Sequence, residues 1–418
     1  MSKSPIAVLR VVAALAALAA GPLSARAAAG VIVVDSAGGG DFTTITAAVA
    51  AAADGDTLLL RGFFEHPDGV RNAGKSLVFV GDAAGVTIFG DNRITNVPAG
   101  GRVVVRGLTF ATFPFNFFLP GVSLTNNAGS VWIEDCSADG WLGSGQSPFC
   151  SGVLFPGGTG LQITNCAAVV VARCQLRGGK GQNSSIQGSV AYRLTDGGAG
   201  ALVSGSKVAF YGCELLAGQG GSGAAVCGEP PSDGGQGVSA INSQLLLSGC
   251  GIVGGLPGSG IGGDGLVLDA GSLVHQHDTT VAAGPGGTAI VNGGILDTFP
   301  GVTRSFELTL SLREGEGGAL EMNGVQGDFV AFFWSFGAAA IPMPARNGWF
   351  VLSPSFLAGP FLLGAITDPG GTWILNVTGP NLPPASEAMT FLLQPYFQYT
   401  GGVTLGSGTA FTLLDASF

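Results

Sequence analysis

Charged side chains are scarce in this sequence, and basic ones are the scarcer kind. Only 11% of the 418 residues are charged, with 17 Lys and Arg against 27 Asp and Glu, so the formal net charge is -10. An acidic chain is poorly suited to bind nucleic acid or anionic lipid, because both of these partners are polyanions. The charge balance therefore excludes those two partner classes from the expected functions.

Residues and motifs that carry chemistry are also few. The sequence contains three histidines, and no stretch stands out as a catalytic motif. Glycine fragments such as GGKG at 178–181 lack the following helix and Lys-Ser/Thr pair that a phosphate-binding loop needs. No cofactor is therefore predicted, and a bound divalent cation stays open as an alternative without support in the sequence.

No apolar run is long enough to span a membrane, which takes about 20 residues. The longest candidate, from Val11 to Ala20, follows Lys3 and Arg10 and precedes the small-residue stretch 25–29. This order is typical of a secretory signal peptide with an A-x-A-like cleavage site. We predict a signal peptide over residues 1–29 and a mature protein, without a transmembrane segment, that is secreted or held at the cell surface.

Glycine and hydrophobic residues are abundant. Glycine accounts for 73 of the 418 residues, and 46% of the chain is hydrophobic. Glycine with little charge is typical of flexible linkers, but this hydrophobic content predicts a large core. We interpret the glycine as turn residues that recur in every unit of a repeat.

The stretch from Gly160 to Gly255 repeats one pattern three times: glycine, two short apolar runs, a cysteine, an aliphatic residue two places on, and more glycine. A looser copy precedes it, so that the cysteines fall at positions 136, 174, 213 and 250. A period of this size with two strand-length runs per unit is typical of a solenoid. We predict an all-β fold in which residues 30–301 form a right-handed parallel β-helix.

Apolar side chains lie five and three positions before each of these cysteines. Residues two apart in a strand share a face, so these pairs are predicted to point into the core. A one-residue corner then turns each cysteine inward. Stacked thiols about 4.8 Å apart favour free cysteines, since a disulfide needs roughly 3.5–4.5 Å between Cβ atoms. The pairs are Val131 and Ile133, Val169 and Val171, Val208 and Phe210, and Leu245 and Leu247.

The segment that begins VIVVDSAGGGDFTTITAAVAAAADGDTLLLRGFFEH at Val31 predicts a strand, an amphipathic helix over 42–53 and a second strand over 57–60. Together with GVTIFGDNR at 85–93, it resembles the N-terminal cap of the pectin lyase-like β-helix superfamily, most closely of the pectinesterases. The resemblance implies a short helix that plugs the open end of the solenoid. It does not extend to activity, because the D-F-[IV]-F-G signature is absent from 96–299 and the nearest string, at 328–330, lies beyond the solenoid.

Long glycine-rich loops, at 140–158, 178–198 and 218–237, leave from the same corner of successive coils. We predict that they project on one side, where solenoids commonly place functional residues. Two loop cysteines, Cys150 and Cys227, are candidates for a disulfide in the oxidising setting of an exported protein.

Two groups of residues are candidates for binding on the outward face of the coils. His275 and His277 lie on one strand about 7 Å apart and could reach a metal, although no third ligand is identifiable and exposed surface histidines are the alternative. Trp132, Glu134 and Tyr211 offer aromatic rings and a carboxylate that suit a sugar ring. The alternative for this second group is that loops cover the side chains.

After Pro300-Gly301 the pattern changes to short strands separated by Pro, Gly and Asn. We predict a C-terminal β-sandwich module over residues 302–418. It is also a candidate cap for the far end of the solenoid, which would otherwise expose an open strand edge. The expected strands are 305–311, 328–336, 349–353, 372–378, 390–399 and 409–415.

Two functions of different classes follow from these features. The first is a non-catalytic secreted or cell-surface protein that binds extracellular glycans or other surface proteins, or assembles with itself. The alternative is a polysaccharide-active enzyme, an esterase or lyase, whose site along the solenoid no motif reveals. The missing pectinesterase residues and the scarcity of acids favour the first, because glycan cleavage commonly uses positioned carboxylate pairs.

Overall fold

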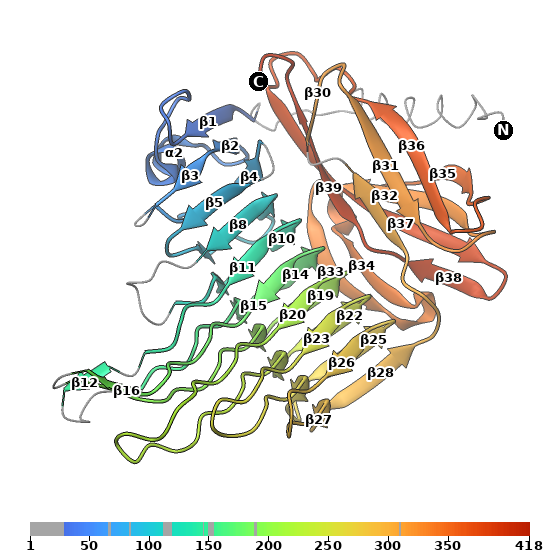
Figure 1. Ribbon diagram of the computed structural model, residues 1–418. Helices are drawn as coiled ribbons and strands as arrows, with labels where there is room; N and C mark the ends of the chain where they lie inside the picture. The colour runs from blue at the N-terminus through green and yellow to red at the C-terminus, as the bar shows by residue number, and fades with distance from the viewer. Residues whose placement is uncertain are drawn as a thin grey trace.

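A computed structural model describes residues 29–65, 68–82, 85–111, 119–144, 146–148, 154–187, 190–308 and 311–418. The predicted signal peptide lies almost wholly outside these residues. Within them, three parallel sheets form a solenoid, which is followed by smaller antiparallel and mixed sheets like a small β-sandwich (Figure 1). The predicted fold class is confirmed at this level.

Each coil of the solenoid contributes strands to three sheets, which we call A, B and C. Sheet A contains β1 (Val31–Asp35), β2 (Thr57–Arg61), β4 (Val78–Gly81), β7 (Arg102–Arg106), β10 (Ser130–Glu134), β14 (Ala168–Ala172), β19 (Lys207–Tyr211), β22 (Gln244–Ser248), β25 (Leu273–His277) and β28 (Ile295–Phe299). Sheet B contains β3 (Phe63–Phe64), β5 (Val86–Phe89), β8 (Leu108–Ala111), β11 (Ser137–Asp139), β15 (Gln175–Arg177), β20 (Glu214–Leu216), β23 (Gly251–Val253) and β26 (Thr280–Ala282). Sheet C contains β6 (Arg93–Thr95), β9 (Val122–Thr125), β13 (Leu161–Thr164), β18 (Ala201–Ser204), β21 (Val238–Ile241), β24 (Leu266–Leu268) and β27 (Ile290–Asn292).

The register of sheet A follows the phase of the repeat. Val131 pairs with Val169, Val169 with Val208 and Val208 with Leu245, and all four side chains are buried in one continuous core. The cysteines at 136, 174, 213 and 250 are buried beside them as free thiols. The corner before each cysteine is left-handed, with φ near +50 to +65° at Asp135, Arg173, Gly212 and Gly249. The predicted inward face and the one-residue corner are therefore confirmed.

One short helix, α2 (Ile45–Ala51), packs on the core at the first coil. The Thr44 hydroxyl caps its N-terminus, and the Asp68 carboxylate accepts hydrogen bonds from the backbone N–H groups of Ile45 and Thr46 at 2.6 and 2.7 Å. Its apolar side chains Ile45, Ala48 and Val49 are buried in the solenoid core. The predicted helix over 42–53 is therefore present but shorter, and it lies at the first coil of the solenoid.

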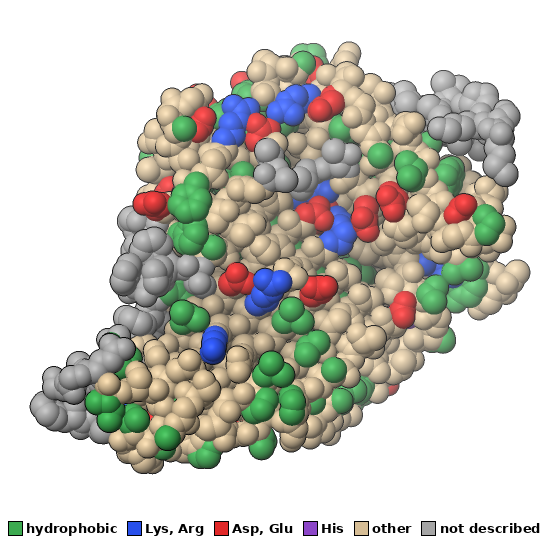
Figure 2. All heavy atoms as spheres, in the orientation of Figure 1, with side chains coloured by type: hydrophobic (Ala, Val, Ile, Leu, Met, Phe, Trp, Pro, Cys, Tyr) green, Lys and Arg blue, Asp and Glu red, His purple; other side chains and the backbone are tan. Residues whose placement is uncertain are grey.

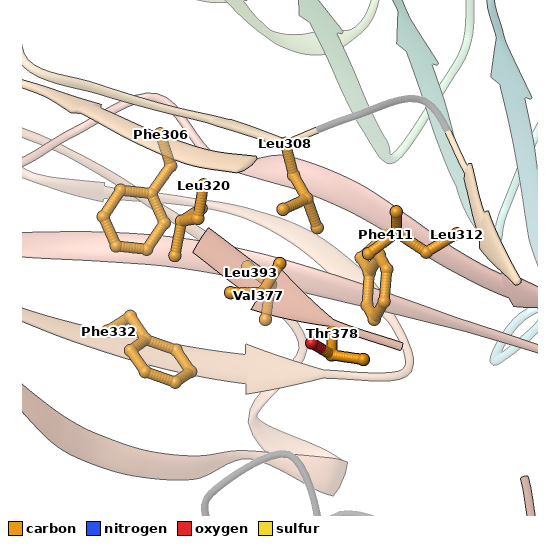
Figure 3. A pocket seen from close by; sticks show the side chains of 9 residues that line it. All are labelled: Phe306, Leu308, Leu312, Leu320, Phe332, Val377, Thr378, Leu393 and Phe411. Carbon is orange, nitrogen blue, oxygen red and sulfur yellow. The ribbon is translucent and has the colours of Figure 1, made fainter. Parts of the chain in front are cut away.

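The C-terminal part folds around its own apolar core. One sheet joins β29 (Ser305–Leu308), β31 (Gly317–Asn323) and β36 (Thr372–Thr378). A second joins β30 (Ser311–Arg313), β39 (Thr409–Leu414), β37 (Ala388–Tyr399), β32 (Phe329–Ser335), β35 (Ala358–Ala365) and β38 (Gly402–Leu405), and a hairpin joins β33 (Ala338–Met343) to β34 (Gly348–Leu352). A cavity of about 20 Å³ lies between the first two sheets. Figure 3 shows the side chains that line it, among them Phe306, Phe332 and Phe411. A space of this size holds about one water molecule and is no ligand site.

The C-terminal domain packs along the outward face of sheet A. One apolar cluster joins Val104, Val170 and Leu246 of the solenoid to Trp349 and Leu392 of the domain, and Figure 1 shows the domain beside the strands of this sheet. The expectation that it caps the far end of the solenoid is wrong. The last strands β26, β27 and β28 each pair with a neighbour on one side only within the described residues.

Candidate functional site

The residues predicted to bind a sugar do face outward from sheet A, but the C-terminal domain covers them. Trp132 is 1% exposed, and Glu134 and Tyr211 are fully buried. The Trp132 Nε1–H donates to Glu134 Oε2 at 2.6 Å, and the Tyr211 hydroxyl donates to the Trp349 carbonyl at 3.4 Å. The prediction of an open glycan-binding face here is corrected, because an apolar sheet face is stabilised by burial against a second sheet.

Glu134 is the centre of an ion-pair network that joins the two parts of the chain. Its carboxylate pairs with Arg106 at 3.0 Å and with Arg173, and it accepts hydrogen bonds from the Thr409 hydroxyl at 2.5 Å and the Ala410 N–H at 2.6 Å. Arg106 donates in turn to the Ala410 carbonyl at 2.5 Å. These charges hold the C-terminal domain in place and are closed to an external ligand.

Asp135 at the adjoining corner completes the network on its solvent side. It pairs with Arg173 at 2.8 Å and with Arg106 at 3.1 Å. Burial alone would lower the pKa of the Arg173 guanidinium, but the neighbouring Glu134 and Asp135 carboxylates raise it above its ordinary value. Arg173 therefore stays charged wherever the fold persists.

The two histidines of the last full coil are also buried at this interface. His275 accepts a hydrogen bond at Nδ1 from Trp349 Nε1–H at 3.1 Å and stacks on Phe299, and His277 is 2% exposed. No group of three His, Cys, Asp or Glu side chains that could hold a metal occurs in the described part of the chain. The histidines are neither exposed nor gathered with further ligands, and their outward direction is the one feature of the prediction that the structure retains.

Acid should weaken the fold through these histidines. Burial lowers the pKa of His275 and of His277 below the ordinary 6.5, although Asp297 opposes this at His275 and Asp278 opposes it at His277. A histidine with a lowered folded-state pKa binds fewer protons when folded, so its stabilisation is complete above pH 6.5 and is lost as the pH falls through the folded-state pKa. We expect a lower free energy of unfolding at pH 5.5 than at pH 7.5 in urea titrations. The double variant His275→Gln, His277→Gln should lose most of that difference, and an unchanged difference would contradict this assignment.

Of the two loop cysteines, the structure describes Cys227 and does not describe Cys150. Cys227 is disulfide-bonded, whereas the other five described cysteines are free thiols. Cys150 lies outside the described residues, so the proposed pair of Cys150 with Cys227 stays a prediction.

The glycine-rich loops project together from one side of the solenoid (Figure 1) and pack as two layers of extended chain. The outgoing layer, which follows sheet B, consists of 140–144, 178–182, 217–221 and 254–258. The returning layer, which leads into sheet C, consists of 156–160, 196–200, 233–237 and 261–265. Hydrogen bonds cross between the layers alternately: Gly179 N–H donates to the Gly158 carbonyl at 2.7 Å, Gly198 N–H to the Gly179 carbonyl at 2.8 Å, and Gly218 N–H to the Gly198 carbonyl at 2.8 Å.

Glycine is required at the contact between these layers. A Cβ atom at Gly157 would lie 1.9 Å from the Gly179 carbonyl oxygen, and one at Gly178 would lie 2.0 Å from the Gly198 carbonyl oxygen. Such distances leave no room for any side chain, since real Cβ contacts are ordinarily longer than about 3.4 Å. The interpretation of the glycine as turn chemistry alone is therefore incomplete: much of it makes a thin double layer.

The returning layer carries a groove of about 370 Å³ that runs across successive coils. Its floor is glycine, at Gly197, Gly234 and Gly262, which leaves backbone open to the groove. One rim is formed by Asp196, Asp233 and Ile261, and the other by Ala199, Gln236 and Asp264, so each rim carries two polar side chains and one apolar one. The neighbours on each rim come from adjacent coils, which stack at about 4.8 Å.

The aspartates of this groove are held by the adjacent coil and still have acceptor capacity. Asp196 Oδ1 accepts from the Asp233 N–H, and Asp233 Oδ1 accepts from the Ile261 N–H, both at 2.8 Å. The second carboxylate oxygen of each aspartate has no hydrogen bond within the described residues. The exposed carboxylate oxygens of Asp196 and Asp233 and the amide of Gln236 can bind hydroxyl groups, and an ionised acceptor makes the stronger kind of hydrogen bond.

The opposite, outgoing layer presents a different surface. Its outward side chains are Leu142, Lys180, Gln219 and Leu256, of which Leu142 is 60% and Leu256 is 57% exposed. Figure 2 shows apolar side chains scattered over the lower part of the molecule, with few charged ones among them. Among the described residues, this layer has no rows of carboxylates like those of the groove. A variant on this layer can therefore serve as a control for a variant in the groove.

Neither a family model nor a curated protein matches the chain. Its class is therefore defined by the fold: a parallel β-solenoid with a β domain docked along one sheet and a glycine-rich double layer on one side. Among the described residues, no helix is long and apolar enough to cross a membrane. The groove aspartates were missed at the sequence level, although TDGGAG at 195–200 and SDGGQG at 232–237 recur one repeat apart and were a signal for them.

Proposed function

We propose that this chain is an exported, non-catalytic protein that binds an extended extracellular glycan along the groove of the returning layer. The observation that carries the proposal is a glycine-lined groove to which three successive coils each contribute one carboxylate, from Asp196, Asp233 and Asp264. An extended sugar chain has a repeat close to the coil spacing of about 4.8 Å, so each of three successive sugars would lie beside one carboxylate. Membership of the pectin lyase-like superfamily, suggested by the N-terminal segment, is part of this proposal.

The charge of the groove favours a particular kind of glycan. Asp196, Asp233 and Asp264 give it three carboxylates, and the chain as a whole is acidic. A polyanionic polysaccharide would be repelled at this surface. We therefore propose a neutral or amino-sugar polymer as the ligand.

Retention of the full mature protein on immobilised neutral, amino-sugar and acidic polysaccharides tests the proposal. The double variant Asp233→Asn, Gln236→Ala keeps the Oδ1 acceptor for Ile261 while removing one charge and one amide. A hydrogen bond to a charged group contributes about 1.5–3 kcal/mol, so binding should weaken about tenfold or more. Lys180→Ala, on the outgoing layer, is the matched control and should bind like the parent.

Three outcomes count against the proposal. The parent could fail to be retained on any polymer, the double variant could bind as tightly as the parent, or the parent could release reducing ends, unsaturated products or methanol. The last result would favour the alternative of a polysaccharide-active esterase or lyase.

Self-assembly is a second candidate function, and the far end of the solenoid favours it. Strands β26, β27 and β28 are edges, and Val291 and Ile295 on them are 38% and 59% exposed. Open strand edges template pairing with another chain. The helix α2 packs on the first coil, so a second copy would pair through its own last coil with the last coil of the first copy. Such a contact between identical surfaces gives a closed dimer. Sedimentation of the parent and of Ile295→Lys should then show a dimer and a monomer, and a monomeric parent would remove this candidate.

A further inference from the structure

We propose that the leader is cleaved after Ala29 and that the ammonium group formed at Gly30 is bound by Asp56 and Glu387, so that processing ties the first coil to the C-terminal domain. This inference rests on the export proposed above. It concerns a part of the molecule separate from the groove.

The backbone at the start of β1 already lies between these two carboxylates. Gly30 N–H donates to Asp56 Oδ1 at 2.9 Å, and Val31 N–H donates to Glu387 Oε2 at 2.8 Å. Glu387 Oε2 also lies 3.6 Å from the position that a Cβ atom on Gly30 would occupy. The backbone of Gly30 and Val31 thus contacts one acid of the solenoid and one acid of the C-terminal domain.

Negative charge at this point lacks a partner. Asp54 lies close by and accepts from the Ser76 N–H at 2.7 Å, and Asp56 Oδ2 accepts from the Ala53 N–H at 2.7 Å. Among the described residues, no Lys, Arg or His forms an ion pair with Asp54, Asp56 or Glu387. A cavity of about 450 Å³, lined by Ala29, Asp54, Arg102 and Ser386, adjoins the site, and the Arg102 guanidinium donates to the Phe336 carbonyl. One positive charge placed on Gly30 would be the missing counter-charge.

Hydrolysis of the Ala29–Gly30 bond supplies that charge. A leader peptidase adds water across the amide, so that the C–N bond breaks, Ala29 leaves with the new carboxylate and Gly30 keeps the nitrogen. An α-amino group has a pKa of about 7.7–8.0 and takes up a proton at neutral pH. The cleavage point agrees with the sequence, since Ala27 and Ala29 provide the small residues of an A-x-A site.

The amide of Gly30 makes one hydrogen bond, whereas an ammonium has three donors and a full charge. It can keep the bond to Asp56 and also reach Glu387. The first strand and the C-terminal domain would then be joined by an ion pair that exists only in the processed chain. Cleavage after Ala27 instead would leave the charge two residues away from these acids.

The test has two parts that can fail independently. The intact mass of protein secreted by an expressing cell should correspond to a chain that begins at Gly30, and a start at any other residue, or no export, would overturn the processing step. The binding of the ammonium is tested on full mature chain released from a cleavable fusion that leaves Gly30 free, compared with the same chain carrying an N-terminal acetyl group.

The free chain should melt about 1–3 °C higher than the acetylated one at pH 6.5 and low salt. Glu387→Gln should remove this difference, whereas Glu214→Gln, an exposed glutamate on sheet B, should preserve it. Equal melting temperatures for the free and acetylated parents, or a difference that survives Glu387→Gln, would overturn the binding of the ammonium whatever the cleavage site and whatever ligand the groove takes.

Discussion

Replacing Glu134 with alanine should destabilise the protein by about 3–5 kcal/mol, because it leaves two buried guanidinium groups without their shared carboxylate. Arg106 has no exposed side-chain surface and Arg173 keeps only 16%. The Thr409 hydroxyl and the Ala410 N–H would also lose their acceptor. Urea unfolding monitored by tryptophan fluorescence measures the change, since Trp132 and Trp349 both lie at this interface.

Glu214→Ala is the matched control for that variant. Glu214 is an exposed glutamate of the same solenoid, and its side chain accepts a hydrogen bond from Gln175 Nε2 at the surface. A surface change of this kind should stay within about 0.5 kcal/mol. If Glu134→Ala proved as mild as Glu214→Ala, the ion-pair network would not hold the C-terminal domain on sheet A.

Replacing Gly198 with alanine should cost about 3 kcal/mol or more, because the new methyl group would meet the backbone of the preceding coil within the returning layer. Its Cβ would lie 2.0 Å from the Gly158 carbonyl oxygen and 2.6 Å from that of Gly157. Neither oxygen belongs to a side chain that could turn away. The two coils would have to move apart within this layer, which would also strain the hydrogen bond from Gly198 to Gly179 in the outgoing layer. Thermal unfolding should show a lower melting temperature, and glycan retention should fall with it.

Gly251→Ala provides the control for the double layer. Gly251 lies in β23, has no left-handed backbone, and its new Cβ would meet nothing closer than the Thr280 Oγ1 at 3.9 Å. This variant should be near neutral. Equal stability of Gly198→Ala and Gly251→Ala would show that the coils of the returning layer do not pack as closely as described.

The solenoid could be predicted from the sequence because every coil buries apolar side chains at the same positions of the repeat. The spacing of Val131, Val169, Val208 and Leu245 from their cysteines predicted the inward face, and the register bears it out. Local chemistry also located the helix near Ile45 and the strand at 372–378. Strands such as β31 and β35 were missed, since their glycine and alternating small residues give a weak strand pattern.

The outward face could not be predicted in the same way. Trp132, Glu134 and Tyr211 have the same residue types whether a sugar or another domain covers them, so only the long-range contact with residues such as Trp349 and Ala410 distinguishes the two. The polar alternation of a strand reports which side faces away from its own core. It carries no information on what lies beyond that side.

The groove was hidden for a different reason. Glycine allows turns as readily as close packing, so the runs around Gly179 and Gly198 do not by themselves indicate two packed layers. The aspartates of the TDGG and SDGG repeats gain meaning only once the floor between the rims is known to be bare backbone.

Hydrogen exchange of the full mature protein, with and without the polysaccharide that retains it best, tests the central claim most directly. Bound glycan should slow exchange in the returning layer, at residues 196–200, 233–237 and 261–265, and leave the outgoing layer and the covered face of sheet A unchanged. Slowed exchange confined to sheet A or to the C-terminal domain, with the returning layer unaffected, would contradict the assignment of the groove as the glycan-binding surface.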